Sequence, residues 1–247
     1  MKTYRTSQVA AAVGVHPNTV RLYEELQMIP KPERQANGYR IFTDYHVEQC
    51  RLVRLAFKVE VVQNGLRNKI VKAIKASAAG NFPEAILLIQ EYIEQVGRDK
   101  AAAEDAVVIV KELLAGEASF GNTYLKRKEV SDALGISMDS LRNWEMNGLL
   151  TVKRKSNGYR IYSEEDVRRL KIIRTLRGAN YSLESILRLL GQLDQNPVTD
   201  IRAVLNTPRG SEDIVSVCDH LIASLTEAEE NAGQMLSILL DMENRFA

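Results

Sequence analysis

The sequence predicts a mainly α-helical chain in which two winged helix-turn-helix domains are each followed by a long coiled-coil helix. Three observations predict this class: an internal repeat, an apolar seam at heptad spacing after each copy of the repeat, and a charge that alternates along the chain. Residues 1–80, 81–120, 121–195 and 196–247 carry formal charges of +7, −5, +5 and −6, although the whole chain carries only +1.

The repeat aligns residues 9–29 with residues 130–150 and, after one residue is dropped, residues 37–54 with residues 157–174. The residues Val9, Gly14, Arg21 and Glu24 fall on Val130, Gly135, Arg142 and Glu145, and the run from Asn37 to Phe42 falls on the run from Asn157 to Tyr162. A duplicated unit decides the architecture, so each copy is expected to fold in the same way.

The first two elements of each copy are predicted to be short helices. Residues 6–13 form an amphipathic helix that ends at Gly14, because glycine accepts the positive φ of a tight turn. Pro17 opens the second helix, where its missing N–H does no harm, and Ser137 caps the corresponding helix of the second copy. Two helices joined by a short turn are the outline of a helix-turn-helix.

The segment after each helix-turn-helix is predicted to be a β-hairpin, or wing. Two short alternating runs are joined by Asn37-Gly38 in copy one and by Asn157-Gly158 in copy two. Thr43-Asp44 and Ser163-Glu164 then provide the cap and the first-turn carboxylate of a further helix.

The apolar seams predict two long helices that pair with each other in antiparallel orientation, because neither can bury its stripe alone. The first seam consists of Ile86, Ile89, Ile93, Val96, Ala103, Val107, Val110 and Leu114, interrupted at Lys100. The second consists of Ile214, Cys218, Leu221, Leu225, Ala228, Ala232, Met235, Leu239, Met242 and Phe246.

These elements predict the domain organisation. Residues 1–80 form the first winged domain, 81–115 the first coiled-coil helix and 116–123 a linker. Residues 124–195 form the second winged domain, 196–210 a loop with a short helix, and 211–247 the second coiled-coil helix.

The positive charge of both winged domains predicts binding to double-stranded DNA, because lysine and arginine neutralise phosphates while the start of a recognition helix can reach base edges. The candidate DNA-binding residues of copy one are Pro17, Asn18, Thr19, Arg21, Tyr23, Arg34, Tyr39 and Arg40. Those of copy two are Met138, Asp139, Ser140, Arg142, Trp144, Lys153, Arg154, Lys155, Tyr159 and Arg160. The alternative is that these are solvated surface charges and tyrosines that pack the hairpin.

The two copies are not expected to recognise the same base sequence. Asn18 can contact adenine through two hydrogen bonds, whereas Asp139 can only accept, for example from a cytosine amino group. Asp139 would also repel a nearby phosphate. The two half-sites should therefore differ.

The runs Val20-Arg21-Leu22-Tyr23-Glu24 and Leu141-Arg142-Asn143-Trp144-Glu145, each followed by a basic wing and Gly-Tyr-Arg-Ile, resemble the DNA-binding domain of the MerR family of bacterial transcription regulators. The run from Tyr181 to Ile186 extends the resemblance in copy two, while copy one has Val61-Val62-Gln63 in place of the family's capping serine. The resemblance implies that Arg21, Arg142, Tyr23, Trp144 and the wing arginines and tyrosines contact DNA.

The resemblance also implies partners. Family members are typically homodimers joined by an antiparallel coiled coil, and they often twist an over-long promoter spacer, which makes RNA polymerase a candidate partner. Because this chain carries both DNA-binding domains, we expect a monomeric single-chain pseudo-dimer in preference to a homodimer. An architectural, chromosome-organising or excisionase-like DNA-binding protein is an alternative that uses the same winged fold.

The sequence favours neither a metal site nor catalysis. Cys50 aligns with Leu170 and Cys218 lies in the second seam, so both thiols are expected to be buried and structural. His46 aligns with Asp166 and is expected on the exposed face, and His220 is expected to face solvent or cap the helix. Phosphate-binding glycine loops, nucleophile elbows and metal triads are absent from the sequence, so we expect a protein that is not an enzyme and has no cofactor.

An unidentified small-molecule effector remains open. The chain stops at Ala247 with Phe246 still on the seam, so a drug-responsive regulator would need a pocket between the coiled coil and residues 191–210. The sequence shows neither a signal-peptide core nor a run of the roughly 18 to 20 apolar residues that a spanning helix needs. We therefore expect a cytoplasmic, nucleoid-associated protein that does not bind membranes.

Overall fold

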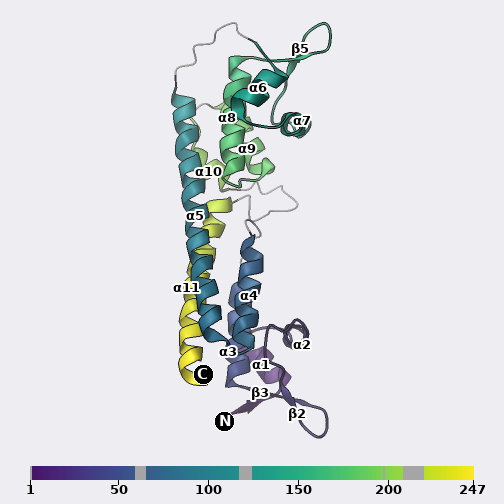
Figure 1. Ribbon diagram of the computed structural model, residues 1–247, viewed down its shortest axis with the longest axis vertical. Helices are drawn as coiled ribbons and strands as arrows, with labels where there is room; N and C mark the ends of the chain where they lie inside the picture. The colour runs from purple at the N-terminus through teal and green to yellow at the C-terminus, as the bar shows by residue number, and fades with distance from the viewer. Residues whose placement is uncertain (1, 59–64, 117–123, 197, 208–219) are drawn as a thin grey trace. The chain divides into compact units, whose positions relative to one another are not determined.

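The computed structural model describes residues 2–58, 65–116, 124–196, 198–207 and 220–247. They divide into two compact units, one of residues 1–98 with 225–247 and one of residues 99–224. The mainly α-helical fold with long helices is confirmed (Figure 1). No described helix combines the length and the apolar character that crossing a bilayer requires.

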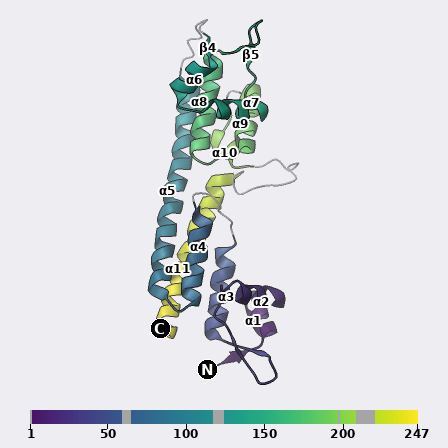
Figure 2. The ribbon, with the colours of Figure 1, turned by 45° about the vertical axis from the view of Figure 1, so that its right-hand side comes forward.

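The first unit begins with a winged helix-turn-helix. Its elements are β1 (Thr3–Tyr4), α1 (Thr6–Val13), α2 (Pro17–Glu25), β2 (Glu33–Arg34), β3 (Arg40–Thr43), α3 (Asp44–Ala56) and α4 (Leu66–Ala78). The predicted wing is the antiparallel pair β2–β3, in which Arg34 lies opposite Arg40, and Figure 2 shows this hairpin projecting from the helices. The predicted bounds of α1 and the predicted start of α2 at Pro17 are confirmed.

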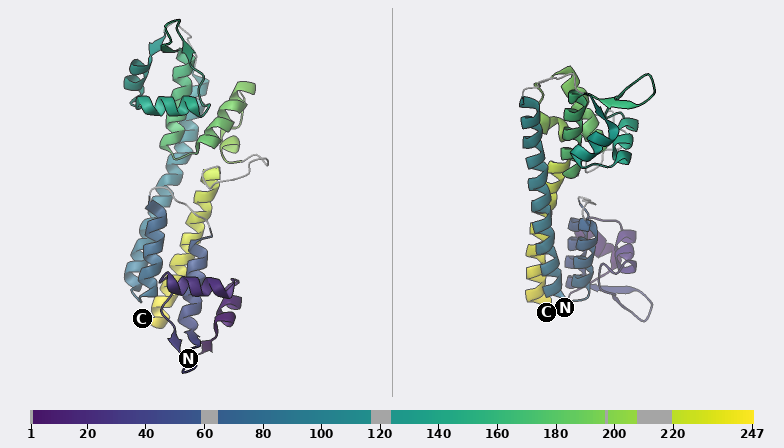
Figure 3. Two further views of the ribbon diagram at one scale, coloured as in Figure 1. Left: turned by 90° about the vertical axis from the view of Figure 1, so that its right-hand side faces the viewer. Right: turned by 45° about the horizontal axis from the view of Figure 1, so that its top comes forward.

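The second unit repeats the same order of elements. They are β4 (Leu125–Lys126), α6 (Arg127–Leu134), α7 (Met138–Met146), β5 (Lys153–Arg154), β6 (Arg160–Tyr162), α8 (Glu164–Gly178) and α9 (Leu183–Gln195), followed by α10 (Ile201–Leu205). The wing β5–β6 pairs Arg154 with Arg160, and the right panel of Figure 3 shows it extending from α6, α7 and α8. The short helix predicted within residues 196–210 is confirmed by α10, which Asp200 caps.

Each winged unit has a third strand that the sequence reading missed. In copy one β1 pairs with β3, so that the strand order is β1-β3-β2, and in copy two the order is β4-β6-β5. Each added strand has only two residues, too few to show an alternating pattern. The strand ties the start of the first helix to the wing.

The two long helices are α5 (Phe82–Ala115) and α11 (Leu221–Phe246). On α11 the predicted seam is buried from Leu221 to Met242. On α5 the seam is partly different, because Ala85 and Tyr92 are buried while Ile86 and Ile93 are only half-buried. Near the start of α5, the buried positions therefore each lie one residue before the predicted seam positions. The antiparallel pairing of the two helices, like the division of the chain into six segments, stays a prediction.

Several sequence predictions fall outside the described residues. They concern Val61-Val62-Gln63, linker residues 117–123, residues 197 and 208–210 of the predicted loop, and the seam positions Ile214 and Cys218. In the described part of copy one, α4 begins after Gly65, whose φ is +75°. In copy two the predicted cap of α9 is confirmed, since the Ser182 hydroxyl accepts the N–H of Ser185 at 2.9 Å.

Candidate nucleic-acid interface

The recognition helix α2 presents a polar face at its start. Gly14, with a φ of +67°, ends α1, and the His16 side chain caps α2 by accepting the N–H of Asn18 at 3.2 Å. Val20 is fully buried, so that Asn18 and Arg21 are exposed. Arg21 Nη1 donates to Asn18 Oδ1 at 3.0 Å, and this bond orients both side chains on the exposed face.

The recognition helix α7 is held in the same way but exposes different groups. The Ser137 hydroxyl accepts the N–H of Ser140 at 3.0 Å and lies 2.9 Å from the Ser140 hydroxyl. Leu141 is buried, whereas Met138, Asp139 and Arg142 are exposed. The exposed face of α7 therefore carries a carboxylate where that of α2 carries an amide.

The aromatic residues of both recognition helices face inward. Trp144 is only 7% exposed, and Tyr23 is half-buried. Burial raises the pKa of Tyr23, and nearby Cys50 raises it further while Arg54 lowers it. Pro17 and Thr19 are half-buried as well. The exposed face of the recognition helix in copy one is thus formed mainly by Asn18 and Arg21.

A glutamate fixes each wing to its recognition helix. In copy one Arg40 Nε donates to Glu24 Oε2 at 2.5 Å, and Arg34 Nη2 lies 3.7 Å from Glu24 Oε1. Because Glu24 is mostly buried, these pairs orient the hairpin relative to the helix.

Copy two repeats this arrangement residue by residue. Arg160 Nε donates to Glu145 Oε2 at 2.5 Å, and Arg154 Nη2 lies 3.3 Å from Glu145 Oε1. Arg40 and Arg160 are half-buried, so their geometry fits a positioning role better than an outward contact. This long-range pairing was not foreseen from the sequence.

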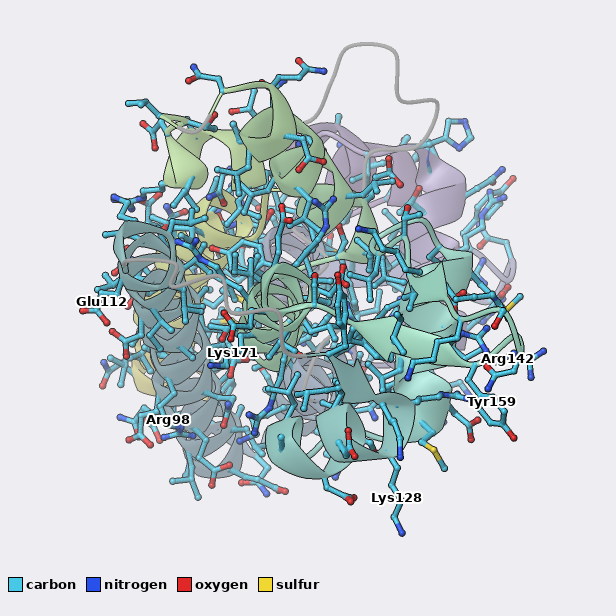
Figure 4. All side chains as sticks on the ribbon, turned by 90° about the horizontal axis from the view of Figure 1, so that it is seen from above. Arg98, Glu112, Lys128, Arg142, Tyr159 and Lys171 are labelled. Carbon is cyan, nitrogen blue, oxygen red and sulfur yellow. The ribbon has the colours of Figure 1, made fainter. Side chains whose placement is uncertain are left out.

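The tips of the wings are strongly exposed. Tyr39 and Tyr159 are 71% and 73% exposed, and both follow a glycine with a φ above +80°. Arg34 in copy one is exposed, as are the three basic residues Lys153, Arg154 and Lys155 in copy two. Figure 4 shows Arg142 and Tyr159 pointing outward on the same side of unit 2.

A groove between the wing and the start of the first helix adds residues that sequence reasoning missed. In copy two it measures about 610 Å³ and is lined by Lys126, Arg127, Lys128, Lys155 and Tyr159, among others. In copy one the corresponding groove measures about 530 Å³, and its lining includes Arg5, Gln8 and Tyr39. Lys128 points outward in Figure 4. The basic run of residues 126–128 was the sequence signal that could have identified this groove.

In each copy a side chain of the helix after the wing forms hydrogen bonds with the segment that follows the recognition helix. In copy one Gln49 Nε2 donates to the carbonyl of Met28 at 3.0 Å and to that of Ile74 at 2.9 Å, and its Oε1 accepts the Ser77 hydroxyl at 2.8 Å. Gln49 is fully buried, so these bonds replace water that cannot reach the site.

In copy two the aligned residue is Arg169. Its Nε donates to the Leu149 carbonyl at 2.9 Å, and its Nη1 donates to Asp194 Oδ1 at 2.8 Å. Leu149 aligns with Met28 and Asp194 lies 120 residues after Ile74, so both copies join the same two segments.

His46 corrects one sequence prediction. It was expected on the exposed face, but it is 6% exposed, because its Nδ1 accepts the backbone N–H of Thr43 at 3.0 Å at the start of α3. The aligned Asp166 makes the same capping contact with Ser163 at 2.8 Å. Burial lowers the pKa of His46, opposed by the Pro30 carbonyl and Glu24.

Cys50 is fully buried, and burial raises its pKa to about 12, as expected of a structural thiol. Cys218 lies outside the described residues. His220 is half-buried, and its Nδ1 has no hydrogen-bond partner among the residues that the structure describes. Within the described ranges, no group of three or more histidine, cysteine or acidic residues is arranged to hold a metal ion.

Comparison with known proteins agrees with this architecture. The profile of MerR HTH family regulatory proteins matches residues 125–193, and that of MerR family regulatory proteins matches residues 5–42. The HTH-type transcriptional regulator HmrR of Rhizobium leguminosarum bv. viciae is 30% identical over 101 residues, which cover 40% of this chain and 74% of that relative. The chain belongs to the MerR family.

Two further relatives match over shorter stretches. The mercuric resistance operon regulatory protein of Bacillus cereus is 35% identical over 51 residues, 21% of this chain and 39% of the relative. The probable heavy metal-dependent transcriptional regulator of Haemophilus influenzae is 38% identical over 77 residues, 31% of this chain and 59% of the relative. The chain thus spans less than two thirds of the length of these two relatives. All three relatives are named as regulators and none as an enzyme, and no solved structure matches the chain.

Proposed function

We propose that this protein is a sequence-specific regulator of transcription that binds double-stranded DNA as a single-chain pseudo-dimer on two non-identical half-sites. The observation that carries the proposal is that two complete winged helix-turn-helix units, each with an exposed polar recognition helix and a basic wing, occur in one MerR-family chain. Two such units in one chain supply what two subunits supply in a dimer.

Contacts inside each unit support the pseudo-dimer. In unit 2 the last turn of α5, the helix that follows copy one, lies against α8 of copy two, where Arg168 Nε donates to the Leu113 carbonyl at 2.7 Å. In unit 1 the last turn of α11, which follows copy two, lies against α3 of copy one, where the Phe246 and Tyr45 rings are 5.2 Å apart. Each long helix therefore ends on the winged unit of the other copy.

DNA binding would rest on charge and shape together. The grooves beside both wings and the wing tips supply lysine and arginine for phosphates, while the first turn of each recognition helix would meet base edges. Glu24 and Glu145 would keep the wings at the angle that lets helix and wing bind at once.

The two half-sites would differ because the exposed groups differ. Asn18 offers both a donor and an acceptor, whereas Asp139 offers only acceptors and repels phosphate. Copy two compensates with a more basic wing and groove, through Lys153, Lys155 and residues 126–128. We therefore expect copy one to contribute more to base discrimination and copy two more to phosphate binding.

Selection of bound sequences from random DNA by the full chain tests the proposal. The expected result is one asymmetric site with two unlike half-sites at a fixed spacing, bound by a protein that sediments as a monomer. A palindromic site bound by an obligate homodimer would contradict it. A promoter-reporter assay then separates a transcription regulator, which changes transcript levels, from an architectural DNA-binding protein, which does not.

Substitutions on the recognition helices test which residues read the site. Arg21→Ala and Arg142→Ala should each weaken binding about tenfold and lower the salt dependence by about one counterion if they reach phosphates. Arg98→Ala, which removes an exposed arginine of α5, is the matched control and should leave affinity unchanged. Full affinity in both recognition-helix variants would contradict the assignment.

A further inference from the structure

One aligned position carries opposite charges in the two copies. Glu48 on α3 and Arg168 on α8 correspond to each other in the repeat. Both belong to the helix that follows the wing, and both contact the last turn of a long helix inside their own compact unit. The two residues contact different groups: each one contacts groups at the end of a long helix that carry the opposite charge or partial charge.

Arg168 forms hydrogen bonds with backbone carbonyl groups at the end of α5. Its Nε donates to the carbonyl of Leu113 at 2.7 Å, and its Nη2 donates to those of Leu114 at 2.5 Å and Gly116 at 3.4 Å. The last carbonyls of a helix have no N–H partner within the helix and form the negative end of its dipole. A guanidinium satisfies them, whereas a carboxylate at the same place would repel them.

Glu48 meets a cation. Arg245 Nη1 in the last turn of α11 lies 3.7 Å from Glu48 Oε1, and it also pairs with Asp241 of its own helix at 2.8 Å. Glu48 is paired in addition with Arg51 of α3, whose Nη1 lies 3.0 Å from Glu48 Oε1. The neighbouring Phe246 ring packs against Tyr45 of α3. Just after the end of α3, Lys58 pairs with Glu227 near the start of α11 at 3.1 Å. The surface of copy one thus fits α11.

We propose that Glu48 and Arg168 select which long helix docks on each copy, and that they favour pairing of copy one with copy two over pairing of like copies from two chains. This inference rests on the single-chain pseudo-dimer proposed above. If copy one paired with copy one of a second chain, Glu48 would face the carbonyls of Leu113 and Leu114. If copy two paired with copy two, Arg168 would face Arg245. Both arrangements place like charges together and leave a docking contact unmade.

A double charge swap, Glu48→Arg with Arg168→Glu, tests the inference in the full chain. The swap makes copy one fit the end of α5 and copy two fit Arg245, so that complete docking now requires like copies from two chains. Light scattering at concentrations from about 1 to about 100 µM should find the wild type monomeric and the swapped protein dimeric. The dimer dissociation constant should be at least about tenfold lower than that of the wild type, which corresponds to about 1.4 kcal/mol.

The single variants and a matched control sharpen the test. Glu48→Arg and Arg168→Glu alone each break one contact, and each should melt at a lower temperature than the double swap, which restores both in the dimer. Lys171→Glu makes the same charge change as Arg168→Glu at an exposed position of α8 and should remain monomeric.

The outcomes separate this inference from the proposed function. A double swap that stays monomeric and melts like the wild type would overturn the selection by charge while leaving the pseudo-dimer intact. A wild type that is an obligate homodimer would overturn the pseudo-dimer and the selection with it. If the swap does not fold, Glu48→Gln with Arg168→Gln removes both charges and keeps a polar side chain at each position. A dimer fraction above that of the wild type then supports the inference, and an unchanged fraction overturns it.

Discussion

The two winged units share a scaffold and differ in the chemistry that the scaffold presents. Both anchor two wing arginines to one recognition-helix glutamate, and both tie the segment after the recognition helix to the next helix through the side chain at position 49 or 169. The exposed face of α2 nevertheless carries Asn18 where that of α7 carries Asp139. The comparison indicates that the geometry of the two units is retained while the groups exposed on their recognition helices have diverged.

The same structural role is filled by unlike residues in the two copies, which makes each pair a natural test. Gln49 is fully buried and neutral, whereas Arg169 reaches the surface and pairs with Asp194, whose side chain is 60% exposed. Removal of each should therefore have different consequences for the stability of its own unit.

The largest expected effect is that of Gln49→Ala. It removes the side-chain donor to the carbonyls of Met28 and Ile74 and the acceptor of the Ser77 hydroxyl, and it opens a cavity, which should lower the free energy of unfolding of unit 1 by about 3 kcal/mol. The matched variant Arg169→Ala loses one carbonyl contact and a largely exposed ion pair, and should cost only about 1 kcal/mol. Hydrogen exchange of peptides from each unit measures the two separately. Equal losses would show that burial does not distinguish the two residues.

The turn of the helix-turn-helix offers a second comparison. Gly14 has a φ of +67°, and a β-carbon there would lie 2.8 Å from Nη1 of Arg54, which donates to the Val13 carbonyl. Gly135 has a φ of +58°, but its nearest neighbour, Nη2 of Arg174, would be 3.9 Å away. Gly14→Ala should therefore cost about 2 kcal/mol and Gly135→Ala about 1 kcal/mol. Chemical denaturation of both variants checks the order, which a larger loss in Gly135→Ala would reverse.

A third comparison concerns the residue that follows the recognition helix. Gln27 adopts a φ of +58°, which is unusual for a residue other than glycine, and the aligned residue of copy two is Gly148 with a φ of +75°. Gln27→Gly should stabilise unit 1 by up to about 1 kcal/mol, and Gly148→Gln should destabilise unit 2 by a similar amount. Thermal unfolding followed by hydrogen exchange reports both changes. A destabilised Gln27→Gly variant would mean that the glutamine side chain contributes more than the backbone strain costs.

The sequence predicted the elements whose signals are local. Gly14, Pro17 and Ser137 mark helix ends through the chemistry of one residue, and the Asn-Gly pairs mark the hairpin turns, so these features could be placed in advance. The pairing of Glu24 with Arg40 spans 16 residues and carries no such signal. It depends on how wing and helix meet, which only tertiary packing determines.

The errors have equally specific causes. The face of α5 was read from an exact heptad, whereas at its start Ala85 and Tyr92 are buried in preference to Ile86 and Ile93. His46 was placed on the surface because it aligns with an aspartate. An aspartate that caps a helix can remain partly in water, but an imidazole in the same position is bulky enough to be covered by the protein.

The smallest expected effect follows from that difference between His46 and Asp166. Burial lowers the pKa of His46 in the folded protein, so the unfolded chain binds the proton more readily. The free energy of unfolding is therefore unaffected by His46 well above the ordinary histidine pKa of about 6.5. It decreases as the pH falls below that value, by at most about 0.8 kcal/mol at pH 6. Unit 1 should therefore open more easily than unit 2 between pH 7 and pH 6, as measured by hydrogen exchange corrected for the intrinsic rate. His46→Asp, which copies the residue of the other unit, should remove this pH dependence, and a dependence that persists in the variant would assign it to another group.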